Sequence, residues 1–77
     1  MKGMRHELDA ISLLCPLPVL KVRKRLQPLE IGDELEMRAD DPAAIVDVPH
    51  FCAEAGHTLV EMRDEGAVQV YVIRKDR

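Results

Sequence analysis

The chain has very few aromatic residues, with one Tyr, one Phe and no Trp among 77. Its core must therefore be aliphatic, and the aromatic platforms that stack on single-stranded nucleic acid are nearly absent. Cysteine is sparse as well, since only Cys15 and Cys52 are present. Their wide separation fits neither a disulfide framework nor a CxxC metal or redox motif. We therefore expect two free thiols with different roles, no metal site and no cofactor.

Long hydrophobic runs are also missing. The most apolar stretch, LLCPLPVL at residues 13–20, contains two prolines and is far shorter than the roughly 20 residues that span a bilayer. The opening MKGMRHELDA carries charge but lacks the apolar segment of a secretory signal. From these absences we expect a cytoplasmic protein with no membrane partner.

The overall composition is that of a folded globular domain. Hydrophobic residues make up 47% of the chain and charged residues 32%, which argues against disorder and against a coiled coil. The length fits a single domain, residues 1–77. A domain of this size cannot enclose a deep substrate chamber, so any active group should lie at its surface.

Hydrophobic periodicity predicts the first three elements. Residues Arg5 to Ala10 form a short strand, and an amphipathic helix runs from Pro16 to about Gln27, where Pro28 stops it. Leu35, Met37 and Ala39 then alternate with charged residues, which is the pattern of a half-buried strand.

The second half of the chain carries two signals for a helix start, Asp40-Asp41-Pro42 and Asp47-Val48-Pro49. We therefore expect a broken segment, a short turn and then a second helix through Phe51 that ends at Gly56. Strands at 59–63 and 67–73 follow, joined by a hairpin at Asp64-Glu65-Gly66. Valines 68, 70 and 72 should supply the core face of the last strand. The order βαβαββ predicts an α/β two-layer sandwich, with two helices on one face of a mixed four-stranded sheet.

Cys15 stands at the mouth of the first predicted helix, between Leu14 and Pro16. Proline is well tolerated in the first turn of a helix, so Pro16 and Pro18 should fix that entrance. A thiol at the cap position faces the positive end of the helix dipole, which favours the thiolate and lowers the pKa of Cys15. A rigid, accessible thiolate can attack a sulfur atom on a partner or carry one itself. Cys52 is predicted to be a core residue.

Four segments together carry a resemblance to the TusA/SirA family of small sulfur carriers: Leu8-Asp9, Cys15-Pro16-Leu17-Pro18, Ala39-Asp40-Asp41-Pro42 and Asp47-Val48-Pro49-His50-Phe51-Cys52. The resemblance implies a two-layer α/β fold. It also implies that the cysteine of the CPxP motif, here Cys15, accepts sulfane sulfur as a persulfide and hands it to a partner protein. The chain would then be a sulfurtransferase-type carrier rather than a stand-alone enzyme. Its partners would be a sulfur donor, such as a desulfurase or a rhodanese-like protein, and a sulfur acceptor.

The residues around Cys15 suggest how such partners are recognised. Ser12, Leu14 and Leu17 depart from the usual family pattern, and the two leucines give the cysteine an apolar rim. Basic residues predominate in residues 1–29 and acidic residues in 30–65, and the acidic segment argues against direct nucleic-acid binding. This segregation is consistent with docking of the basic helix on an acidic partner and equally with ordinary solvated helix and strand faces. We expect the docking surface to comprise Leu13, Leu14, Leu17, Lys21 and Arg25.

Two alternatives remain open from the sequence. The same fold could serve as a non-catalytic regulatory or interaction module with an inert Cys15. Cys15 and Cys52 could instead form a redox pair if the fold brings them together.

Overall fold

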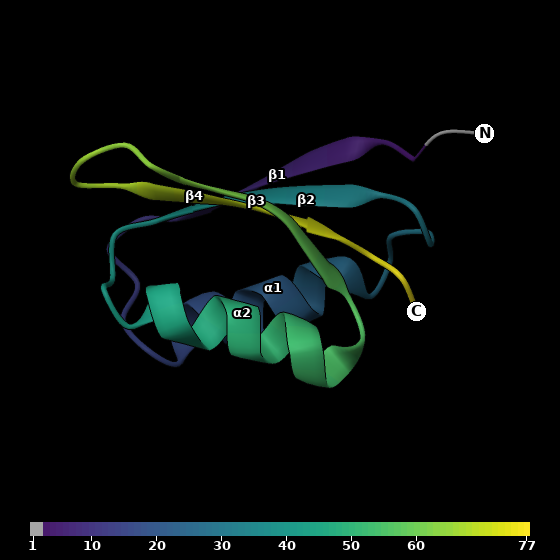
Figure 1. Cartoon of the computed structure of the whole chain (residues 1–77), viewed down its shortest axis with the longest axis horizontal. Coiled ribbons are helices and arrows are strands. Elements are labelled where there is room, and N and C mark those ends of the chain that lie inside the picture. Colours follow the sequence, from purple (N-terminus) through teal and green to yellow (C-terminus); the bar gives the residue numbers. More distant parts are fainter. Residues whose placement is uncertain (1–2) are drawn as a thin grey trace.

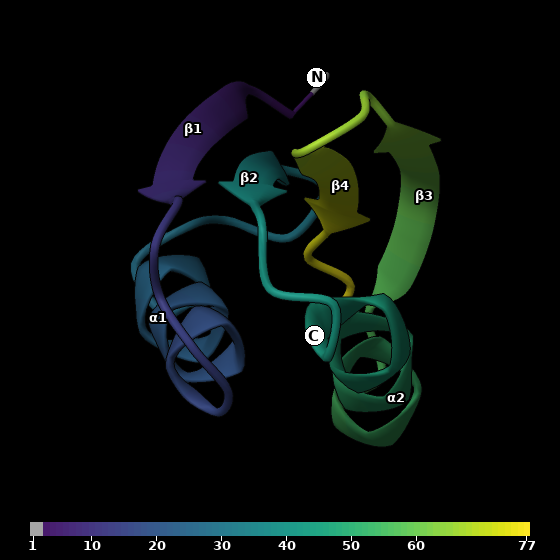
Figure 2. The same ribbon diagram turned by 90° about the vertical axis from the view of Figure 1, so that its left-hand side faces the viewer.

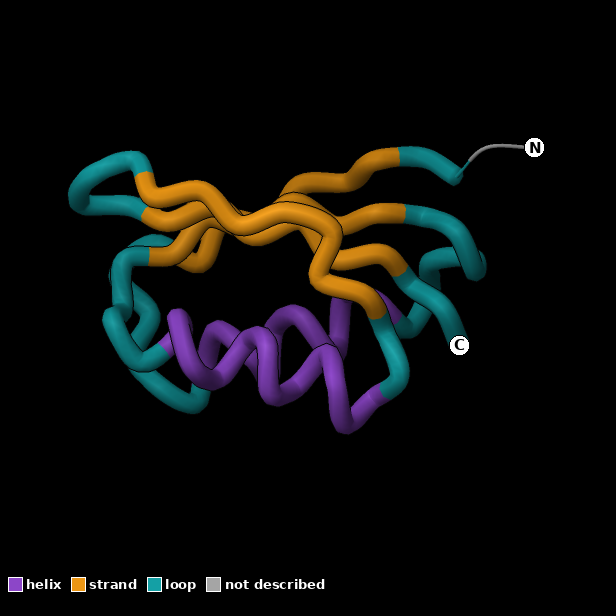
Figure 3. The backbone as a smooth tube through the Cα atoms, in the orientation of Figure 1, coloured by secondary structure: helices purple, strands orange, loops and turns teal. Residues whose placement is uncertain are grey.

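The computed structural model describes residues 3–77, in which strands and helices alternate in the order βαβαββ. The helices form one layer and the strands the other (Figures 1 and 3). This confirms the predicted two-layer sandwich. The elements are β1 (Arg5–Ala10), α1 (Leu17–Leu26), β2 (Glu34–Ala39), α2 (Ala44–Ala55), β3 (Thr58–Asp64) and β4 (Gln69–Arg74).

The sheet has the strand order β1-β2-β4-β3. Strands β1 and β2 are parallel, whereas β4 runs antiparallel to both of its neighbours. A parallel pair needs a long crossover, which α1 supplies. Figure 2 shows α1 beneath β1 and β2, and α2 beneath β4 and β3. The mixed sheet is therefore covered by helices on one face.

The core lies between the two layers and is almost entirely aliphatic, as the composition predicts. Val22 and Leu26 of α1 meet the sheet, as do Val48, Phe51 and Cys52 of α2. The sheet contributes Leu8, Ala10, Leu35, Met37, Ala39, Tyr71 and Ile73. Cys52 is thus a core residue, as predicted.

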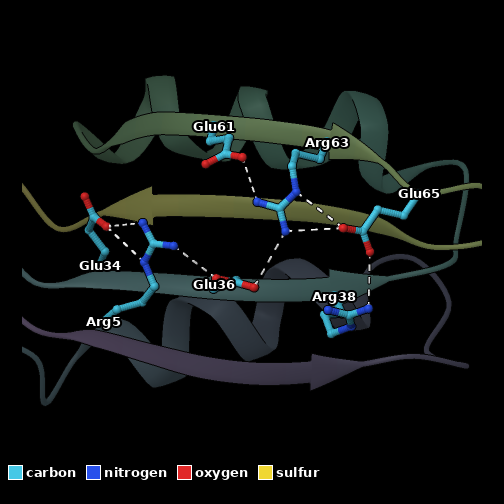
Figure 4. Close-up of polar contacts among 7 residues, drawn as sticks. All are labelled: Arg5, Glu34, Glu36, Arg38, Glu61, Arg63 and Glu65. Carbon is cyan, nitrogen blue, oxygen red and sulfur yellow. Dashed lines mark hydrogen bonds and ion pairs between the residues drawn. The ribbon is translucent and has the colours of Figure 1, made fainter.

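The predicted core face of β4 is wrong by one residue. Tyr71 and Ile73 belong to the core beneath the sheet, while Val70 and Val72 pair with charged residues of β2 and β3 on the outer face. Both valines are nevertheless fully buried. Because long charged side chains cover apolar surface with their aliphatic stems, the outer face buries these valines without a second layer of helices. The charged side chains of that face are drawn in Figure 4.

The predicted break in the second helix is also wrong. Helix α2 continues from Ala44 to Ala55 with Pro49 inside it. Proline removes one backbone hydrogen bond from a helix interior, but burial of Val48 and Phe51 against the sheet offsets that loss. Gly56 ends the helix in the left-handed region at φ 81°, as expected.

Candidate functional site

The segment between β1 and α1 carries Cys15 and is held by two aspartates that follow β2. Asp40 Oδ1 accepts the Ser12 N–H at 2.9 Å, and Asp41 Oδ2 accepts the Cys15 N–H at 2.6 Å. Asp41 also accepts the N–H of Ala43 at 3.1 Å, just ahead of α2. One carboxylate, only 9% exposed, therefore fastens the cysteine segment to the start of the second helix.

The parallel pairing of β1 and β2 explains this arrangement. Ala10 and Ala39 are partners at the ends of the two strands. The residues that follow them, Ile11-Ser12 and Asp40-Asp41, therefore leave the sheet at the same edge. Ser12 turns the chain there with a φ of 71°, and the Asp40 carboxylate holds its N–H.

The two prolines lie at the helix entrance as predicted. Pro16 is the N-cap of α1, and its carbonyl accepts the N–H of Leu20 at 3.1 Å. Pro18 is in the first turn and is buried. The helix therefore begins at Leu17, and Cys15 lies one residue before the cap rather than at it.

The Cys15 side chain is exposed, and its Sγ–H donates to Asp47 Oδ2 at 3.0 Å. The predicted direction of its pKa shift is wrong. The hydrogen bond to Asp47, partial desolvation and the negative charges of Asp47 and Asp41 raise the pKa of the Cys15 thiol. The sulfur lies outside α1 and beside the acidic first turn of α2, so nearby carboxylates oppose its ionisation. Cys15 is accessible, but its thiol donates a hydrogen bond to the Asp47 carboxylate.

Cys15 opens onto a hollow of about 290 Å³ between α1 and α2. Its walls carry both signs of charge, and the Arg23 guanidinium lies over the Phe51 ring at 5.1 Å from the centroid. His50 Nε2 lies 3.4 Å from Glu54 Oε2 across the rim. The lining residues are Cys15, Pro16, Val19, Arg23, Asp47, His50, Phe51 and Glu54.

The residues predicted to dock partners differ in how accessible they are in the structure. Leu14 and Leu17 are exposed beside Cys15, at 68% and 47%, and Lys21 is exposed further along α1. Leu13 is partly buried against the core, and Arg25 donates to the carbonyl of Glu7 at 2.9 Å. The structure thus leaves Leu14, Leu17 and Lys21 as the more accessible members of this set.

The hollow also contains residues that sequence reasoning did not assign to the site. Asp47, His50 and Phe51 come from α2, and Arg23 comes from the face of α1 that adjoins it. The signal for the α2 residues was present in the Asp47-Val48-Pro49-His50-Phe51 segment, which carried part of the family resemblance. Arg23 had no comparable signal.

Cys52 is chemically distinct from Cys15. It is buried in the core, and burial raises its pKa to about 11. Both thiols are free. Among residues 3–77, no cluster of three or more His, Cys, Asp or Glu side chains could hold a metal ion, and no helix is long and apolar enough to cross a bilayer.

The fold and the site define a small two-layer α/β protein with one accessible cysteine at a proline-flanked helix entrance. The family model described as sulfurtransferase TusA matches residues 6–75, so the chain belongs to the TusA family. The crystal structure of a SirA-like protein from Desulfitobacterium hafniense superposes with a TM-score of 0.78. That match has 21% sequence identity and covers 96% of this chain and 99% of the other, and it establishes the shared fold. Membership of the family supports a role as a sulfur carrier.

Proposed function

We propose that Cys15 is the sulfur-carrying residue, accepting sulfane sulfur from a donor protein as a persulfide and passing it to an acceptor protein. The observation that carries the proposal is the exposed thiol on a segment held by Asp40 and Asp41, in a chain of the TusA family. The cytoplasm is the proposed compartment, because a reducing environment keeps such thiols free.

The chemistry needs a nucleophilic sulfur and a place for its proton. Cys15 Sγ attacks the outer sulfur of a donor persulfide, D–S–SH, and the bond between the two donor sulfurs breaks. The Cys15 proton passes to the carboxylate of Asp47, and the donor leaves as the thiolate D–S⁻. The product is Cys15–S–SH, so atoms and electrons balance without an oxidant. Transfer to the acceptor repeats the exchange with Cys15 as the leaving thiolate.

A raised pKa is compatible with this role. It lowers the fraction of thiolate at neutral pH, but a thiolate of higher pKa is intrinsically more nucleophilic. Asp47 at 3.0 Å is placed to accept the proton during the attack. The site therefore suits a thiol that is activated in a complex rather than one that is ionised in solution.

The test is intact mass spectrometry after incubation with inorganic polysulfide, which delivers sulfane sulfur without a protein donor. We expect a gain of one sulfur that survives Cys52→Ser and disappears in Cys15→Ser. A gain that persists in Cys15→Ser would overturn the assignment.

The second candidate is a non-catalytic interaction module in which Cys15 is inert. The upward pKa shift of Cys15 favours it, because an unactivated thiol is the expected state of such a residue. It predicts no persulfide on Cys15 under the same polysulfide treatment. The mass experiment therefore separates the two functions.

A further inference from the structure

A groove along α1, on a different face from the Cys15 hollow, combines an apolar floor with basic side chains. Leu17 and Leu20 are about half exposed, at 47% and 49%. Large aliphatic side chains gathered on an exposed surface mark a contact site when polar groups surround them. The groove has a volume of about 530 Å³ and is lined by Leu8, Leu17, Leu20, Lys21, Lys24, Arg25 and Pro28.

Two lysines of this groove differ from the arginines on the outer face of the sheet. On the outer face of the sheet, Arg5, Arg38 and Arg63 each pair with glutamates at 3.3 Å or less (Figure 4). In contrast, Lys21 and Lys24 are exposed and form no ion pair within residues 3–77. The sheet therefore neutralises its own cations, while α1 presents its lysines to the surroundings.

Lys21 and Lys24 are not needed as hydrogen-bond donors to the last backbone carbonyl groups of α1. Basic residues near a helix C-terminus often serve the last carbonyl groups and the dipole. Here Lys75, from beyond β4, fills that role, because its Nζ donates to the carbonyls of Leu26, Gln27 and Leu29 at 2.9, 3.1 and 2.8 Å. Lys21 and Lys24 remain available to an anionic group from outside.

The groove is placed so that its occupant reaches Cys15 without covering it. It follows α1, a helix of 10 residues and therefore about 15 Å long, from Leu17 toward Pro28. Helix α1 begins at Leu17, two positions after Cys15. The groove and the Cys15 hollow share no lining residue. A partner bound along α1 would thus leave the thiol open to a reactive group at the helix entrance.

We propose that this groove docks an acidic amphipathic segment of a protein partner, with carboxylates against Lys21 and Lys24 and apolar side chains against Leu17 and Leu20. The inference rests on the carrier role proposed above and adds the chemical character of one partner. An apolar floor favours a protein segment over nucleic acid, because the groove offers no aromatic ring for base stacking.

The experiment is an NMR titration of the full-length ¹⁵N-labelled protein, in the Cys15→Ser background to prevent oxidation. The probe is a synthetic 14-residue peptide with Glu and Leu at helical spacing, and the matched peptide has Gln in place of every Glu. We expect the Glu peptide to shift amide signals in residues 17–28 and to bind at least tenfold more tightly than the Gln peptide. Its affinity should fall as salt rises.

Three variants test which side chains matter. The double variant Lys21→Glu, Lys24→Glu and the single variant Leu20→Ser should each weaken binding at least tenfold. Arg38→Glu reverses a charge on the sheet instead and should leave binding unchanged. Equal loss in Arg38→Glu, or full binding in Leu20→Ser, would overturn the proposal.

Competing occupants are separated in the same titration. Tighter binding of oligo-uridine or of phosphatidylglycerol vesicles at residues 17–28 would replace the protein segment with nucleic acid or lipid. Shifts that grow with protein concentration alone would identify a second copy of the chain. With Cys15 restored, polysulfide loading should be normal in the Lys21→Glu, Lys24→Glu variant. A wild-type protein that fails to load disproves the carrier role, whereas normal loading without peptide binding disproves only this docking site.

Discussion

Asp41 should contribute more to stability than Asp40, the other carboxylate that holds the Cys15 segment. It accepts two backbone N–H groups, from Cys15 at 2.6 Å and from Ala43 at 3.1 Å, and it is nearly buried. A hydrogen bond to a charged group contributes about 1.5 to 3 kcal/mol. Because water can replace part of the loss at the exposed segment, we expect Asp41→Ala to lower the free energy of unfolding by about 2 to 4 kcal/mol. In a domain of this size that corresponds to a fall in Tm of roughly 10 to 25 °C.

The assay is denaturant and thermal unfolding followed by circular dichroism. Asp40→Ala is the matched control, since Asp40 is half-buried and accepts only the N–H of Ser12, so its loss should lower stability by about 1 kcal/mol. Asp41→Asn keeps one acceptor oxygen and should fall between the two, which preserves the test if Asp41→Ala does not fold. Equal effects of Asp40→Ala and Asp41→Ala would refute the idea that Asp41 is the anchor of the cysteine segment.

Three further predictions concern single side chains. Asp47→Asn removes a negative charge beside Cys15, so the pKa of the thiol should fall and alkylation by iodoacetamide near neutral pH should accelerate; an unchanged pH profile would contradict the assigned cause. Tyr71→Phe removes a buried hydroxyl that has no hydrogen-bond partner within residues 3–77, so the free energy of unfolding should stay level or rise by about 1 kcal/mol, and a loss of that size in urea unfolding would reveal a missed partner. Cys52, whose pKa burial raises to about 11, should react with a disulfide reagent at pH 8 only at the rate of unfolding, and prompt labelling in Cys15→Ser would show the core to be open.

Local sequence signals predicted the order of helices and strands well. They failed at two points, the core face of β4 and the start of α2. Strand β4 reads Val70-Tyr71-Val72-Ile73, and all four side chains are buried, so a period of two could not say which pair faces the helices. The break expected at Pro49 failed for a different reason. A proline is a local signal, and the packing of α2 on the sheet overrides it.

The position of Cys15 in the candidate site could be predicted from the sequence, but the direction of its pKa shift could not. The prolines and the helix pattern placed Cys15 at an entrance to α1, and the structure agrees. The raised pKa depends on Asp47, which lies 32 positions further along the chain. No helical or strand periodicity connects residues so distant. Only the packing of α1 beside α2 brings the carboxylate to the sulfur.

The same topology that positions the thiol also opposes its ionisation. Parallel β1 and β2 end side by side, which brings Asp41 to the Cys15 segment as its anchor. Its negative charge, with that of Asp47, then raises the pKa of the sulfur that the anchor holds. The fold therefore keeps Cys15 fixed and accessible while raising the pKa of its thiol. A partner whose cations lie near Asp47 on docking would reverse the shift, so the reactivity of Cys15 should be higher in a complex than in the free protein.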